Sequence, residues 1–205
     1  MARKTAAEAA RTRRRILEAA SELFSREGVS STTLDQIARQ AGVTRGAIYW
    51  HFKGKQDLLD ALFSEQTLPL ENDRPQAVDF HRGWQRLHDD LVATVSGEGP
   101  RRLSEIMLYQ GACGSDPSTH QRRLDWVRGL LQHHLRRLLE SAVSRQELPP
   151  SLDVPGVLEF CCIAITGLLY ECLHDNPHPQ EAISATLAVL QHVAKAPPRH
   201  LLLEG

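Results

Sequence analysis

The sequence has few aromatic residues, few cysteines and no long apolar run. Phe, Trp and Tyr make up 5% of its 205 residues, and no stretch of 18 uninterrupted apolar residues occurs. We therefore expect no membrane-spanning segment. The N-terminus is basic but lacks the apolar core of a secretion signal, which predicts a cytoplasmic protein that makes no membrane contact.

The cysteines and histidines do not have the spacing of a metal site. There are four cysteines and no C-x-x-C pair, so zinc-ligand spacing is absent. His174 and His178 have ligand-like spacing, but Pro177 breaks the helix between them. We predict free buried thiols, solvated histidines, and no metal or cofactor. A thiol redox sensor and a metal sensor are the alternatives. The cysteines are Cys113, Cys161, Cys162 and Cys172.

Common catalytic signatures are also missing. The chain has no G-x-S-x-G, P-loop, G-x-G-x-x-G or H-E-x-x-H pattern. A DNA-cleaving enzyme would need clustered carboxylates for its metal ions, whereas the acidic residues here are spread along the chain. We predict that the protein is not an enzyme.

The net charge of −1 hides an uneven distribution. Residues 1–55 hold 11 Lys and Arg against 5 Asp and Glu, a net charge of +6, and the remaining residues carry −7. A basic segment attached to an acidic one is typical of a DNA-binding domain joined to a part that does not bind DNA.

No segment alternates in the manner of a strand, and helical spacing runs through most of the chain. The pattern predicts an all-α fold: a helix-turn-helix domain at 1–55, a connecting helix at about 55–66, a helical ligand-binding and dimerisation domain at 67–196, and a poorly ordered tail at 197–205. We expect a loose arm over residues 1–10. Helices are expected at 11–27, 77–96, 101–113, 118–146, 153–174 and 178–195.

Residues 32–55 have the pattern of two short helices joined by a tight turn. Thr33 and Gln36 form a capping-box pattern, Gly42 supplies the left-handed turn residue, and Thr44 is a suitable N-cap for the second helix. The first helix has one apolar face at i, i+3, i+4 and i+7 spacing, which consists of Leu34, Ile37, Ala38 and Ala41.

The second helix carries side chains suited to the major groove. Arg45 can form two hydrogen bonds with a guanine edge, and Gly46 permits close approach. Phosphate contacts are expected from Tyr49, His51, Lys53 and Lys55. The arginine run upstream is either a solvated face or a further backbone or minor-groove contact; it consists of Arg11, Arg13, Arg14 and Arg15.

The segment from Val154 to Leu173 is apolar on all sides. Such a helix must be covered on more than one side. We therefore expect a homodimer in which this helix and the 178–195 helix pack against their copies. The predicted interface residues are Phe160, Ile163, Gly167, Tyr170, Leu187 and Leu190.

Scattered aromatic and polar residues after position 67 favour a small-molecule pocket between helices. Plain core packing is the alternative for each of them. The residues that we expect to contact a lipophilic effector are Trp84, Met107, Tyr109, Trp126, Leu130 and Phe160.

The run from Gly42 to Lys53, G-V-T-R-G-A-I-Y-W-H-F-K, closely resembles the recognition helix of TetR/AcrR-family transcriptional regulators, particularly the local repressors of multidrug efflux pumps. The resemblance is strong over residues 1–66. It implies an all-helical homodimer of about nine helices that represses from a palindromic double-stranded DNA operator and is released by a small molecule. A metabolite-responsive regulator, or an activator, remains the alternative.

The resemblance also assigns residues by position. It implies phosphate contacts from Thr33, Thr44, Tyr49, His51 and Lys55. It implies base contacts from Arg45, Gly46 and Ala47. Gly54 departs from the Asp or Asn that the family often has before the last lysine of the motif.

Overall fold

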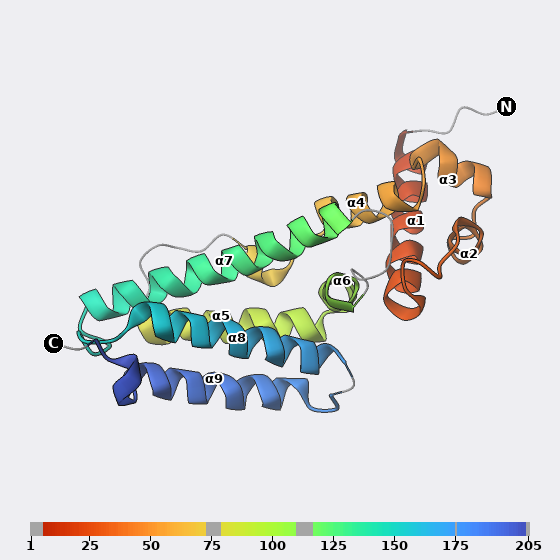
Figure 1. The fold of residues 1–205 in the computed structure, drawn as a ribbon. Coiled ribbons are helices and arrows are strands. Elements are labelled where there is room, and N and C mark those ends of the chain that lie inside the picture. Colours follow the sequence, from red (N-terminus) through yellow and green to blue (C-terminus); the bar gives the residue numbers. More distant parts are fainter. Residues whose placement is uncertain (1–5, 73–78, 110–116, 175, 204–205) are drawn as a thin grey trace. The chain divides into compact units, whose positions relative to one another are not determined.

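The computed structural model describes residues 6–72, 79–109, 117–174 and 176–203, and the side chains of 109 and 117–122 are outside this description. Within these residues it contains nine α-helices, two short 3-10 helices and no strand (Figure 1). The prediction of an all-α fold is confirmed. The helices are α1 (Ala6–Glu27), α2 (Leu34–Gln40), α3 (Arg45–His51), α4 (Lys55–Glu65), α5 (Phe80–Ser96), α6 (Glu98–Tyr109), α7 (Pro117–Ser144), α8 (Val154–Leu173) and α9 (Pro179–Lys195), with 3-10 helices at Pro69–Glu71 and Arg199–Leu201.

The chain forms two compact units. The head unit comprises residues 1–67 and 102–123, and the body unit comprises residues 68–101 and 124–205. Residues 102–109 and 117–123 are thus grouped with the head, although they fall inside the range 67–196 that we expected to form one ligand-binding domain. The helices α6 and α7 each cross from one unit to the other.

The core of the head forms on α1, which packs against α2, α3 and α4. Ile16, Leu23 and Phe24 are buried on one face of α1, as the helical spacing predicts. The capping box is confirmed: the Thr33 hydroxyl accepts from the backbone N–H of Gln36, and the Gln36 side chain accepts from the backbone N–H of Thr33.

Two turns of the head are fixed by cationic side chains. Gly42 has a φ of 61°, the left-handed conformation that favours glycine. Beside it, the Arg15 guanidinium donates to the carbonyl oxygen of Ala41 at 2.6 Å. At the connection between α1 and α2, Lys55 Nζ donates to the carbonyl oxygens of Ser30 and Thr32, both at 2.9 Å.

In the body unit, α5 packs against α8 and α9, and these helices run side by side (Figure 1). The indole N–H of Trp84 donates to the carbonyl oxygen of Leu187 on α9 at 3.0 Å. Gly83 allows α7 to approach α5 closely, because a Cβ atom there would lie 2.4 Å from Leu138 Cδ1. Arg101 donates to three carbonyl groups at the ends of α5 and α8, so it holds these two ends together.

Two helix starts and the chain end differ from expectation. Helix α1 begins at Ala6, inside the expected loose arm, and α6 begins at Glu98, because Pro100 lies in its first turn, where no intrahelical N–H is needed. The tail residues Leu201 and Leu203 bind the segment before α8: the N–H of Asp153 donates to Leu201 O, and the N–H of Leu203 donates to Ser151 O.

The helix α8 is long and apolar enough to cross a membrane by length and composition. Its mean hydropathy is 1.7, and about a third of it is buried. The core helix of a soluble protein can have the same length and composition, so the absence of a membrane-spanning segment stays a prediction. Helices with these properties also occur where a second protein surface covers them.

The tail contacts generate a prediction about stability. Deleting residues 201–205 removes the two backbone hydrogen bonds that join the tail to Ser151 and Asp153, so we expect the free energy of unfolding to fall by about 1–3 kcal/mol. Urea unfolding monitored by circular dichroism measures the change. Deleting only residues 204–205 is the matched control, and equal stability of the two truncated proteins would contradict the role of the tail.

Candidate functional site

The second helix of the helix-turn-helix, α3, exposes one face and buries the other. Thr44 caps it, accepting from the backbone N–H of Ala47 at 3.2 Å. Ile48 is buried in the head core, as is Phe52 just after the helix. The opposite face is open to solvent and carries Arg45, Gly46, Tyr49 and Trp50. This face is the candidate DNA interface.

Arg45, one of the predicted base-contacting residues, has side-chain partners in the absence of DNA. Its guanidinium donates to the carboxylate of Asp35 on α2 at 3.2 Å and to the hydroxyl of Tyr49 at 3.3 Å. It also lies over the Tyr49 ring. The Tyr49 hydrogen bond, followed by the charge of Asp35, raises the pKa of Arg45. These exposed contacts limit the rotamers of Arg45 and leave it accessible.

The predicted phosphate-contacting threonines differ in what they can offer. The Thr33 hydroxyl donates to the side-chain oxygen of Gln36 at 2.7 Å, so its hydrogen is used inside the capping box. The Thr44 hydroxyl accepts from Ala47, which leaves its own hydrogen to donate to a phosphate oxygen. Thr44 is therefore better suited to a phosphate contact than Thr33 in this conformation.

Three further predicted phosphate contacts, His51, Lys53 and Lys55, lie at or after the end of α3. Lys53 is exposed, and His51 is half-buried with its ring edge-on to Trp50 at a centroid distance of 4.5 Å. Lys55 is half-buried and already binds two carbonyl groups. A lysine ammonium has a third hydrogen to donate, so Lys55 can contact a phosphate without releasing the loop.

The arginine run at the start of α1 is partly structural. Arg13 forms a two-pronged ion pair with Glu65 and lies over the Phe52 ring, and Arg15 binds the α2–α3 turn. Arg14 pairs with Glu18 on the same helix and stays exposed. Two of these four arginines therefore stabilise the head.

Sequence reasoning missed Trp50 on this face and Asp35 on α2, which binds Arg45. Trp50 is 73% exposed and lies two positions after Ile48, which on a helix places it nearly opposite the buried side. That spacing could have identified it. Asp35 contacts Arg45 across ten residues of sequence, and no local pattern indicates this contact.

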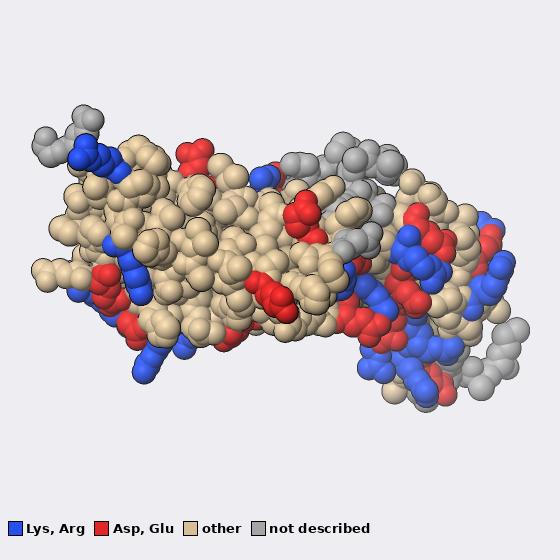
Figure 2. Space-filling view, turned by 90° about the horizontal axis from the view of Figure 1, so that it is seen from below, with Lys and Arg blue, Asp and Glu red and all other residues tan. Residues whose placement is uncertain are grey.

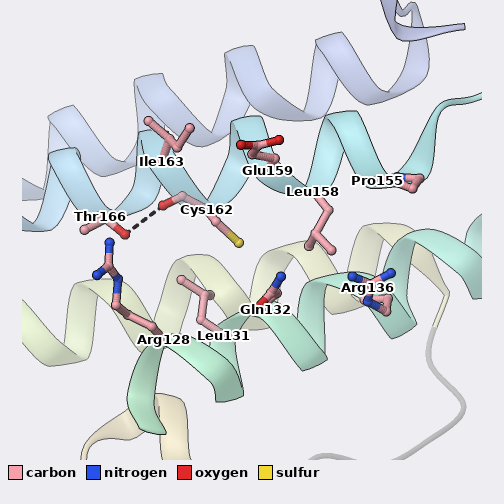
Figure 3. Close-up of a pocket in the computed structure, with 10 residues that line it drawn as sticks. All are labelled: Arg128, Leu131, Gln132, Arg136, Pro155, Leu158, Glu159, Cys162, Ile163 and Thr166. Atoms are coloured by element: carbon pink, nitrogen blue, oxygen red, sulfur yellow. Dashed lines mark hydrogen bonds between the residues drawn. The ribbon is translucent and has the colours of Figure 1, made fainter. Parts of the chain in front are cut away.

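The predicted effector residues differ in burial and belong to both units. Trp84 is 4% exposed and bonded to Leu187 O, Trp126 is half exposed, and Leu130 is half-buried. Met107 is buried in the head unit, and the side chain of Tyr109 lies outside the described residues. None of the five residues whose side chains are described lines the groove between α7 and α8 that Figure 3 shows.

The predicted dimer residues divide into two groups. Phe160, Ile163, Gly167 and Tyr170 are all exposed on α8, with Ile163 at 66%. Leu187 and Leu190 are 2% and 1% exposed, because they point into the body against α5 and α8, so an interface would use other residues of α9. Figure 2 shows few charged side chains on the α9 side of the body. We name the four α8 residues the α8 stripe.

Of the described cysteines, Cys161 and Cys172 are buried and Cys162 is half-buried. Burial raises the pKa of Cys161 to about 12, and it also raises the pKa values of Cys162 and Cys172. Thiols with raised pKa values are poor nucleophiles at neutral pH, which disfavours a redox sensor. Cys113 lies outside the described residues. Among the residues that are described, no cluster of three or more His, Cys, Asp or Glu could hold a metal ion.

Comparisons with known proteins agree with this geometry. Residues 16–62 match the family model of bacterial regulatory proteins, tetR family. The chain is 41% identical to the HTH-type transcriptional regulator SrpR of Pseudomonas putida, over 204 residues that cover 100% of this chain and 95% of SrpR.

Two solved structures are also similar. MexZ, described as a key repressor responsible for antibiotic resistance in Pseudomonas aeruginosa, has a TM-score of 0.75 at 26% identity, covering 95% of this chain and 99% of its own. NalD, the secondary repressor of the MexAB-OprM multidrug efflux pump in Pseudomonas aeruginosa, has a TM-score of 0.65 at 28% identity, covering 89% and 96%.

The position of Arg45 generates a prediction about base specificity. Arg45→Ala should weaken binding to the operator by about 1–3 kcal/mol and relax the preference at one base position, because a contact with a base edge is lost. Fluorescence anisotropy with the operator and its single-base variants measures both effects. An equal loss on unrelated DNA would show that Arg45 contacts only the backbone.

Alanine variants of Lys53 and Lys55 should distinguish a loss of DNA contact from a loss of stability. Lys53→Ala should weaken binding to all DNA and reduce the salt dependence by one phosphate contact, with little change in stability. Lys55→Ala should do the same and also lower the melting temperature, because two buttressing hydrogen bonds are lost. Salt titrations and thermal unfolding of both variants provide the measurement. An unchanged melting temperature for Lys55→Ala would exclude its structural role.

Proposed function

The chain belongs to the TetR family of bacterial regulatory proteins, and from this premise we propose that it is a ligand-released repressor of a drug-efflux operon, of its own gene, or of both. It is a transcriptional repressor of this family and not an enzyme. The single observation that supports the proposal most is the capped α2–turn–α3 unit with Arg45 presented on its exposed face. We infer a cytoplasmic location, where the DNA is.

The proposed operator is palindromic double-stranded DNA bound by a homodimer. One α3 helix reads only a few base pairs, so two heads related by a two-fold axis are needed for a specific site, with half-sites about 34–36 Å apart or a multiple of this. The exposed α8 stripe supports a dimer through the body, because it places apolar side chains in water unless a second chain covers them.

The proposed effector is a small lipophilic molecule. The efflux assignment follows the described role of NalD and is proposed for this chain by similarity. A full release from the operator requires the effector to prefer the released state by about 10⁴-fold, or about 5.5 kcal/mol. A regulator that responds to a metabolite, or an activator, is the second candidate, because family membership does not determine the ligand.

The proposed release can be tested by fluorescence anisotropy. DNA from upstream of the protein's own gene is titrated at fixed salt, with and without a panel of lipophilic drugs. We expect tight binding that some compounds reverse. Tight binding that no drug reverses but a metabolite does would favour the second candidate. Trp84→Ala is a poor probe of the pocket, because Trp84 is a buried core residue.

The dimer proposal predicts the effect of a charge on the α8 stripe. Ile163→Glu should produce a monomer in sedimentation experiments and lower operator affinity by about 100-fold or more, because the second head no longer binds as part of the same molecule. His133→Glu, at an exposed position of α7, is the matched control. An Ile163→Glu protein that remains dimeric would show that the interface lies elsewhere.

A further inference from the structure

A groove in the body unit runs between α7 and α8 (Figure 3). Its volume of about 360 Å³ is within the range of small-molecule sites. Side chains from α7 form one wall and side chains from α8 form the other. The lining residues are Arg128, Leu131, Gln132, Arg136, Pro155, Leu158, Glu159, Cys162, Ile163 and Thr166.

The α7 wall of this groove is cationic. Arg128 and Arg136 are eight residues apart on one helix, so their backbones lie about 12 Å apart along its axis and on the same side. Neither guanidinium has a hydrogen bond or an ion pair with another described residue. Gln132 lies halfway between them and offers an amide N–H group.

The floor of the groove is apolar. Leu131 and Leu158 are both buried, and in Figure 3 the Leu158 side chain points toward α7. The Thr166 hydroxyl donates to Cys162 O within α8 at 2.7 Å, so its hydrogen is used inside the helix. Burial raises the pKa of Cys162, which keeps this thiol uncharged at neutral pH.

One carboxylate, that of Glu159, also lines the groove. In Figure 3 it points away from α7, and it forms no ion pair with either arginine. The groove therefore combines an apolar floor with two arginines on one wall that form no ion pair with a described residue. An amphipathic anion complements this arrangement. Its apolar part covers the apolar floor of the groove and excludes water from it, and its anionic head group pairs with a guanidinium.

We propose that the α7–α8 groove is a binding site for an amphipathic anion, a molecule with an apolar body and a carboxylate, sulfate or phosphate group. The site contains none of the residues expected to contact the lipophilic effector, so it would be a second site beyond the proposed function. Ile163 belongs both to the groove and to the α8 stripe, so a ligand here would lie at the edge of the proposed dimer interface.

Isothermal titration calorimetry of the full-length protein with decanoate, below its micelle concentration, tests the site without DNA. Decyltrimethylammonium has the same chain length and the opposite charge, so it is the matched ligand control. We expect saturable binding of decanoate and at least tenfold weaker binding of the cation. If decanoate does not bind, the groove is closed, for example by a second copy of the chain, and the proposal is wrong.

Three variants then locate the binding. The double variant Arg128→Gln, Arg136→Gln should lose decanoate affinity by about tenfold or more, because charge-assisted hydrogen bonds are lost. Arg137→Gln removes a neighbouring exposed arginine outside the groove and should bind as the unmodified protein does. Glu159→Gln should tighten decanoate binding, because a repelling charge is removed. Unchanged affinity in the double variant would place decanoate elsewhere and overturn the proposal.

Thermal unfolding and operator anisotropy of the same variants separate this result from the proposed function. A double variant that is folded and binds the operator, yet has lost decanoate, supports the second site. If the unmodified protein does not bind an operator, the proposed repressor function is contradicted, but the decanoate binding measured by calorimetry still supports the second site.

Discussion

The geometry of the head depends on cationic side chains that bind main-chain carbonyl groups at its two turns. Arg15 binds the α2–α3 turn at Ala41, and Lys55 binds the α1–α2 connection at Ser30 and Thr32. Carbonyl groups at helix ends have no intrahelical partner, and a charged donor satisfies them with a strong hydrogen bond. The orientation of α3 is therefore set before DNA binds.

This use of positive charge changes how the basic head is understood. A net charge of +6 over residues 1–55 suggests many phosphate contacts, yet Arg13 and Arg15 are engaged inside the head. The long-range field still attracts DNA, because it depends on total charge. Specific contacts depend on the side chains that stay accessible, and these lie on and beside α3.

The body presents the opposite situation, with apolar surface where charge is expected. Helix α8 buries Val157, Cys161 and Ile165 against the body and leaves the α8 stripe exposed. The groove beside the stripe adds two arginines without partners among the described residues. Exposed apolar area and unpaired charge on adjacent surfaces are both features that a bound partner would compensate.

The sequence by itself determined the helices, the capping box at Thr33 and Gln36, the turn at Gly42 and the apolar faces of α1 and α2. These features depend on contacts within about four residues, so local spacing is sufficient to predict them. It also contained the signal for Trp50. It could not show that α1 extends back to Ala6 or that the tail pairs with residues 151–153.

Only the tertiary structure decided which of the predicted site residues are accessible to DNA or to a second chain. Asp35 holds Arg45, Lys55 supports a loop, and Leu187 and Leu190 face the core rather than a second chain. The α7–α8 groove also combines residues about thirty positions apart. Such contacts join segments distant in the sequence, and they depend on how helices pack, which the periodicity of a single helix does not specify.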